Sequence, residues 1–156
     1  MAASAGALAQ VAAGIETSAF GTFMRESAWA YPAFNLAHLL GLVLLVGGIG
    51  VVDLRVLELW RRLPLAELSR TLTPVALAGL AIMAVSGPAL FAADARALAG
   101  SATLGWKLAL VAVALANALG FRALWPARRL GDSAPLAARV SAGLSIVLWL
   151  WIAALG

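Results

Sequence analysis

The sequence has no cysteine, a single histidine, His38, and few charged residues. Without cysteine, the chain cannot form disulfides, thiolate zinc sites or iron–sulfur clusters of its own. One histidine also leaves too few ligands for a metal site within one chain, so we expect no such site. Because no serine–histidine–acid set is present, we assign no catalytic residue and do not expect a hydrolase.

Hydrophobic residues make up 63% of the chain and charged residues 12%, whereas a typical soluble domain is roughly half apolar and about 25% charged. The excess falls in four long apolar stretches, which we predict to span the membrane at about residues 32–53, 74–91, 103–124 and 136–155. At ~1.5 Å per residue, such stretches are long enough to cross a hydrocarbon core of ~30 Å. We therefore predict one all-α membrane domain, residues 1–156, folded as an antiparallel four-helix bundle.

Residues 1–30 contain no basic residue before Arg25, which is not typical of a signal peptide. They fit two short helices better. Leu8 and Ile15 share one helical face, and Ser18 can cap the second helix. Short segments of this kind lie in the membrane interface with the apolar face down. We expect these two helices to be interfacial.

Prolines mark the expected limits of the second span. Pro64 opens a short helix, and Thr73 followed by Pro74 resembles the start of a new helix, with proline at its first position. Gly87 and Pro88 interrupt the same span near its end, where we expect a kink.

Basic residues are distributed unevenly between the two sides of the membrane. Of the 11, eight belong to the loops and helix ends that follow spans one and three, and three belong to the opposite side. The eight are Arg55, Arg61, Arg62, Arg70, Arg122, Arg128, Arg129 and Arg139. The positive-inside rule then predicts a multi-pass protein of the bacterial inner membrane with both termini in the periplasm. Since these residues explain the net charge of +4, we expect no nucleic-acid partner.

Small residues recur every four positions within the spans. In the first span they are Ala33, Ala37 and Gly41. In the second, Gly79 and Gly87 lie four residues before and after Met83. Small residues let helices approach closely in lipid, where no hydrophobic drive brings helices together. Such stripes favour a tight bundle and serve a dimer equally well, so we expect a homo-oligomer.

Polar residues inside a membrane are costly and are therefore candidate functional residues. Counting along the spans places one group at a similar depth in the outer leaflet, where its members could form a pocket open to the outside. The members are Asn35, His38, Met83, Ser86, Lys107 and Trp149.

Several roles for His38 remain open: axial ligand of a haem b, proton relay, or hydrogen-bond partner of a quinone-like molecule. A haem could take Met83 as its second ligand, or a second His38 across a two-fold axis. The structural alternative is a neutral histidine bonded to a serine or a carbonyl of a neighbouring helix. Lys107 could neutralise an anionic group of a ligand or extend to the outer interface.

Asp53 lies fifteen residues after His38, or ~22 Å further along the helix, and so belongs to a separate site. We predict an ion pair at the cytoplasmic rim among Asp53, Arg55 and Arg122, which anchors the helix ends. Asn117, in the inner half of the third span, is predicted to bond between helices rather than to bind a substrate.

One part of the chain, about residues 27–125, resembles a family of small four-span bacterial inner-membrane proteins described only as a domain of unknown function. The matching residues are Ser27, Trp29, Tyr31-Pro32, His38-Leu39-Leu40-Gly41, Val52-Asp53-Leu54-Arg55, Ser86-Gly87, Leu90-Phe91, Lys107 and Asn117. The resemblance implies the four-span architecture but no established activity. Where members of that family often have a histidine near the end of the third span, this chain has Phe121-Arg122. The architecture is similar, more distantly, to the copper-resistance D membrane proteins.

Three classes of function follow from these features. The first is a membrane anchor or redox partner with an outward-facing pocket around His38 for a haem or a quinone-like ligand, acting with a periplasmic or membrane redox protein. The second is a small oligomeric transporter or channel, with His38, Asn117 and Asp53 spaced along a polar path. The third is a structural membrane subunit without a ligand.

Overall fold

The computed structural model describes residues 2–126 and 134–155, and all its regular elements within these ranges are helices. The helices are α1 (Ala2–Glu16), α2 (Ala19–Glu26), α3 (Ala30–Val56), α4 (Leu65–Ala93), α5 (Ala95–Ala99), α6 (Ala102–Leu124) and α7 (Leu136–Ala154). Arg128 and Arg129, two of the eight arginines on the predicted cytoplasmic side, lie outside the described residues.

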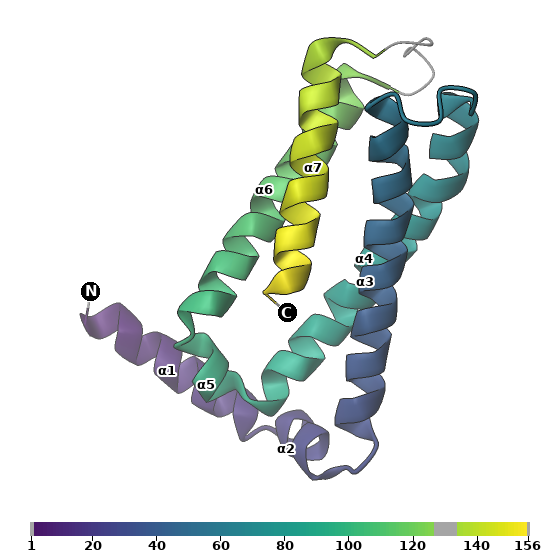
Figure 1. Ribbon diagram of the computed structural model, residues 1–156. Coiled ribbons are helices and arrows are strands. Elements are labelled where there is room, and N and C mark those ends of the chain that lie inside the picture. Colours follow the sequence, from purple (N-terminus) through teal and green to yellow (C-terminus); the bar gives the residue numbers. More distant parts are fainter. Residues whose placement is uncertain (1, 127–133, 156) are drawn as a thin grey trace.

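Four helices, α3, α4, α6 and α7, are long and apolar enough to cross a membrane. They alternate in direction, and the link from α3 to α4 lies at the same end of the molecule as the beginning of α7 (Figure 1). Helix α3 packs most extensively on α4, while α7 packs against both α3 and α6. The predicted all-α, antiparallel four-helix bundle is confirmed, and the chain is a multi-pass membrane protein.

The limits of α4 differ from the prediction. A helix boundary was expected at Pro74, but α4 begins at Leu65 and runs unbroken through Pro74 and Pro88. A proline inside a helix loses one backbone hydrogen bond and crowds the carbonyl four residues before it. Packing explains why the helix continues: Gly48 of α3 lies directly against Ala76 and the Leu72 carbonyl, on both sides of Pro74.

Helices α3 and α4 approach each other closely at two glycines. A Cβ atom added to Gly41 would lie 2.8 Å from the Gly79 carbonyl oxygen, and one added to Gly79 would lie 2.5 Å from the Gly41 carbonyl oxygen. Here the two backbones touch without side chains between them. Gly41, Gly48 and Gly79 therefore serve packing between α3 and α4 within one chain.

Two buried clusters hold the remaining helices together. The larger joins Leu45, Ala76, Ala114, Leu148, Trp149 and Ile152 from all four long helices. The second, near the α3–α4 link, joins Val52, Val56, Leu65, Ala138 and Ala142. Helix α6 contributes only Ala114 to the buried residues described, so most of its surface faces outward.

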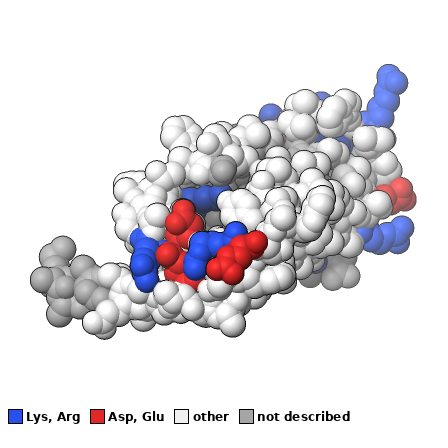
Figure 2. Space-filling view, turned by 90° about the horizontal axis from the view of Figure 1, so that it is seen from below, with Lys and Arg blue, Asp and Glu red and all other residues white. Residues whose placement is uncertain are grey.

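The N-terminal helices lie across one end of the bundle (Figure 1). Ser18 caps α2 as predicted, because its hydroxyl accepts a hydrogen bond from the amide of Gly21. The Glu16 carboxylate accepts a 2.8 Å hydrogen bond from the Arg96 amide, and Arg25 donates a 2.7 Å bond to the Glu16 carbonyl. The first contact ties α1 to α5 and the second ties α2 to the end of α1. Figure 2 shows charged side chains gathered on this end. The interfacial position of α1 and α2 stays a prediction.

Candidate functional site

His38 and Ser86 meet between α3 and α4. The Nδ1 atom of His38 lies 2.9 Å from the hydroxyl of Ser86, and that hydroxyl lies 2.7 Å from the carbonyl oxygen of Ile82. Ser86 is buried, whereas the ring of His38 is only partly buried. Gly87 leaves room for the ring: a Cβ atom placed there would lie 3.5 Å from Cε1 of His38.

These two contacts favour the tautomer of His38 that carries its proton on Nδ1. A serine hydroxyl has one proton to donate, and the Ile82 carbonyl can only accept. When Ser86 donates to Ile82, it accepts from Nδ1–H of His38. A neutral ring with its proton on Nδ1 carries a lone pair on Nε2. This is the arrangement of a histidine whose second nitrogen accepts a hydrogen bond or binds a metal.

The other members of the predicted pocket are distributed unequally around His38. The ammonium group of Lys107 on α6 is close enough to act electrostatically on the imidazole ring. Met83 packs on Gly41, one turn from His38, and belongs with Trp149 to the larger buried cluster. Asn35 is exposed on the surface of α3. The structure thus brings Ser86 to His38, with Lys107 within electrostatic range of the ring. It places Met83 and Trp149 in the adjoining core and leaves Asn35 outside.

The packing around Met83 bears on how a haem could bind. A porphyrin held by both His38 and Met83 would have to enter between α3 and α4. These helices touch at Gly41 and Gly79, and the Cγ atom of Met83 already lies 2.9 Å from the position of a Cβ at Gly41. Ligation by this pair would therefore require the two helices to separate.

Asp53, Arg55 and Arg122 do not form the predicted ion pair within the described part of the chain. Residues two apart on a helix point in nearly opposite directions, so Asp53 and Arg55 cannot face one another. Arg122 is exposed, whereas Asp53 and Arg55 are only 5% and 4% exposed. The C-terminal end of α3 is instead held by contacts that the sequence pattern did not indicate.

Arg55 binds the loop between α3 and α4. Its Nε donates a 2.7 Å hydrogen bond to the Leu63 carbonyl, and its Nη2 donates a 3.1 Å bond to the Arg61 carbonyl. Two residues of this loop, Glu58 and Trp60, have positive φ angles of 71° and 51°. Such angles are unfavourable for residues other than glycine, so Arg55 stabilises a strained loop.

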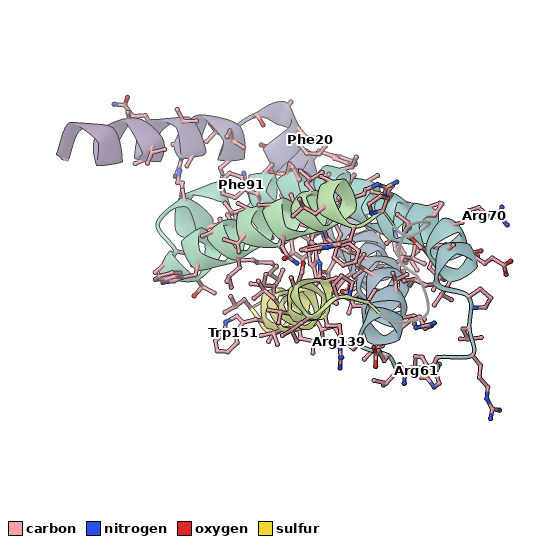
Figure 3. The ribbon with its side chains drawn as sticks, turned by 90° about the horizontal axis from the view of Figure 1, so that it is seen from above. Phe20, Arg61, Arg70, Phe91, Arg139 and Trp151 are labelled. Carbon is pink, nitrogen blue, oxygen red and sulfur yellow. The ribbon has the colours of Figure 1, made fainter. Side chains whose placement is uncertain are left out.

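Glu58 forms two ion pairs, at 3.3 Å with Arg61 and at 3.7 Å with Arg139 of α7. Figure 3 shows Arg61 and Arg139 on the same side of the molecule, while Arg70 points outward from α4. The pair with Arg139 connects the α3–α4 loop to α7. Because the carboxylate and the guanidinium are 81 residues apart in the sequence, spacing alone could not have paired them.

Asn117 bonds between α6 and α7. Its amide nitrogen donates a 3.1 Å hydrogen bond to the Ser141 carbonyl, and its amide oxygen accepts a 2.8 Å bond from the Ser141 hydroxyl. His38, Asn117 and Asp53 thus occupy three different helix interfaces and do not line one path within the chain.

Replacing Asn117 by alanine should lower the free energy of unfolding in bicelles by about 1–2 kcal/mol, since both hydrogen bonds to Ser141 are lost. The double-mutant cycle with Ser141→Ala isolates the coupling between the two side chains. Leu119→Ala, on the exposed surface of the same helix, is the control. A coupling energy near zero would contradict the role of this pair.

A recess of about 160 Å³ lies between α3 and α7. Its lining is entirely apolar and consists of Val46, Ile49, Gly50, Leu54, Ile146, Trp149 and Leu150. Pockets for whole ligands usually measure roughly 300–1,000 Å³. The recess is therefore too small for a haem.

A comparison of the chain with protein-family models, curated proteins and solved structures finds no match. The arguments about function therefore depend on the geometry of these groups.

Proposed function

We propose that the protein is a membrane anchor or redox subunit of the bacterial inner membrane, and that the His38 site binds the headgroup of a quinone-like molecule. The orientation proposed from the arginine distribution, with both termini in the periplasm, makes this site face outward. The family resemblance, a homo-oligomeric state and a redox partner in the membrane or the periplasm are parts of the same proposal.

The observation that carries the proposal is the hydrogen-bonded chain from His38 through Ser86 to the Ile82 carbonyl. It leaves Nε2 as an acceptor, which suits the hydroxyl of a reduced quinone. Lys107, whose charge acts on His38, is the candidate donor for the carbonyl oxygen of the oxidised form. A quinone headgroup is also far smaller than a porphyrin and does not require α3 and α4 to separate at Gly41 and Gly79.

Binding of decylubiquinone or menadione to the detergent-purified protein tests the proposal. Quenching of tryptophan fluorescence should report the binding, because Trp106 adjoins Lys107 on α6. We expect His38→Ala to weaken binding about tenfold, the effect of losing one hydrogen bond of ~1.4 kcal/mol. The control is Leu39→Ala, which changes an exposed neighbour of His38 on the same helix.

Two results would contradict this function. Equal quinone affinity in the wild-type protein and the His38→Ala variant would remove His38 from the binding site. A Soret band in the purified protein that disappears in His38→Ala would replace the quinone by a haem.

A further inference from the structure

Asp53 is a buried carboxyl group that the His38 site does not use. It lies inside α3, is 5% exposed, and its Oδ2 atom has no hydrogen-bond partner among the described residues. Among the described residues, the hydroxyl of Ser145 on α7, itself 5% exposed, lies near this carboxyl group. The two groups approach without the geometry of a full hydrogen bond to Oδ2.

Among the described residues, the cations near this end of the bundle are either bound to other groups or exposed. On α3 itself, Arg55 donates to the carbonyls of the following loop. On α7, Arg139 pairs with Glu58. On α6, Arg122 is exposed, and on α4 the charged residues of the same end, Glu67 and Arg70, are exposed as well. An ionised carboxylate buried without a partner costs several kcal/mol, so the neutral acid is the stable form of Asp53 in the bundle.

A metal ion does not fit this position. Cations that bind to oxygen take about six ligands, and this site offers one carboxyl group and one hydroxyl group. Nowhere in residues 2–126 and 134–155 do three His, Cys, Asp or Glu residues gather in a way that could hold a metal ion. The ligand that a single carboxyl group can hold is a proton.

The apolar recess lies in the same α3–α7 interface, and its lining includes Leu54, the residue next to Asp53 in the sequence. Gly50 and Leu54 of α3 line it on one side and Ile146 and Trp149 of α7 line it on the other. A Cβ atom added to Gly50 would meet nothing within 4 Å, in contrast to the direct backbone contact between α3 and α4 at Gly41. The α3–α7 interface therefore has room to open beside the carboxyl group.

We propose that Asp53 is a proton-binding site within the membrane: its carboxyl group holds a proton between α3 and α7 and exchanges it with water when this interface opens at the recess. This site is independent of quinone binding at His38. It gives the protein a group whose protonation depends on how α7 packs on α3.

The test uses N,N′-dicyclohexylcarbodiimide, an apolar reagent that reacts with protonated carboxyl groups in membranes. After treatment of the full-length protein in liposomes at pH 6, mass spectrometry should find one carbodiimide adduct, at Asp53. The adduct should be absent from Asp53→Asn and should form more slowly as the pH is raised to 9. Glu58→Gln, which removes a carboxylate with two arginine partners, should be labelled like the wild-type protein.

Three outcomes would overturn the proposal. The first is the absence of an adduct at Asp53, and the second is labelling that does not depend on pH. The third is protection from labelling by sodium chloride but not by choline chloride, because that result would indicate a bound metal cation. Infrared spectroscopy provides a second measurement, since the band of a protonated carboxylic acid should be present in the wild-type protein and lost in Asp53→Asn. Asp53→Asn should keep the thermal midpoint of the wild-type protein or exceed it. If Asp53 were instead part of a structural ion pair, losing that pair would make this variant less stable.

Discussion

Replacing Gly79 by alanine is expected to lower the free energy of unfolding by about 3 kcal/mol, near the upper end for an overpacked core. The added Cβ atom would lie 2.5 Å from the Gly41 carbonyl oxygen and 2.6 Å from the Leu45 amide nitrogen. Both are backbone atoms and cannot rotate away, so α3 and α4 must separate. Reversible unfolding in mixed detergent micelles, followed by circular dichroism, measures the change.

Gly47→Ala is the matched control, since it is the same substitution in a neighbouring span. Nothing lies within 4 Å of a Cβ atom at Gly47. The intrinsic preference of helices for alanine should therefore stabilise this variant by up to ~1 kcal/mol. Opposite signs at Gly79 and Gly47 would identify the helix contact as the cause. If both substitutions had the same effect, close contact at Gly79 would not explain the loss.

The four membrane helices could be predicted because lipid leaves the chain few alternatives. A spanning segment must satisfy its backbone hydrogen bonds internally, so about 20 apolar residues are sufficient to indicate a helix. The cap at Ser18 could be predicted for a similar reason, since its hydroxyl replaces a local bond that the first turn lacks. Both inferences depend on interactions close in the sequence.

The beginning of α4 could not be predicted in this way. Thr73 and Pro74 follow the local pattern of a helix start, yet they lie within one continuous helix. What decides the outcome is the contact of Gly48 with Leu72 and Ala76, across the α3–α4 interface. Local sequence contains no information on that partner.

Depth in the membrane was easier to predict than the direction in which a side chain points. Counting residues along the spans placed His38 and Ser86 at one level, and the structure has them in contact. When a helix is apolar on all sides, its sequence does not indicate which face packs against the neighbouring helices. Hence Asn35, one turn from His38, is exposed, and Asp53 packs against Ser145 of α7 rather than beside an arginine.

Replacing Arg55 by methionine is expected to lower the free energy of unfolding by about 3 kcal/mol. Methionine has a similar length but cannot donate to the Leu63 and Arg61 carbonyls. Hydrogen bonds from a charged group contribute roughly 1.5–3 kcal/mol each, and part of the loss is recovered when water reaches these exposed residues. Hydrogen exchange of the loop amides, at residues 57–63, should accelerate most, because this loop includes two residues with positive φ.

The matched control changes the exposed arginine of the same loop. Arg61 pairs with Glu58 at 3.3 Å, but its side chain is 61% exposed, so Arg61→Met should cost less than about 1 kcal/mol. Arg55→Lys separates charge from geometry: it keeps the positive charge but lacks the fork that reaches two carbonyls. If lysine restored full stability, charge near the end of α3 would be the important property. If lysine left most of the loss, the stability of this end would depend on the two directed hydrogen bonds.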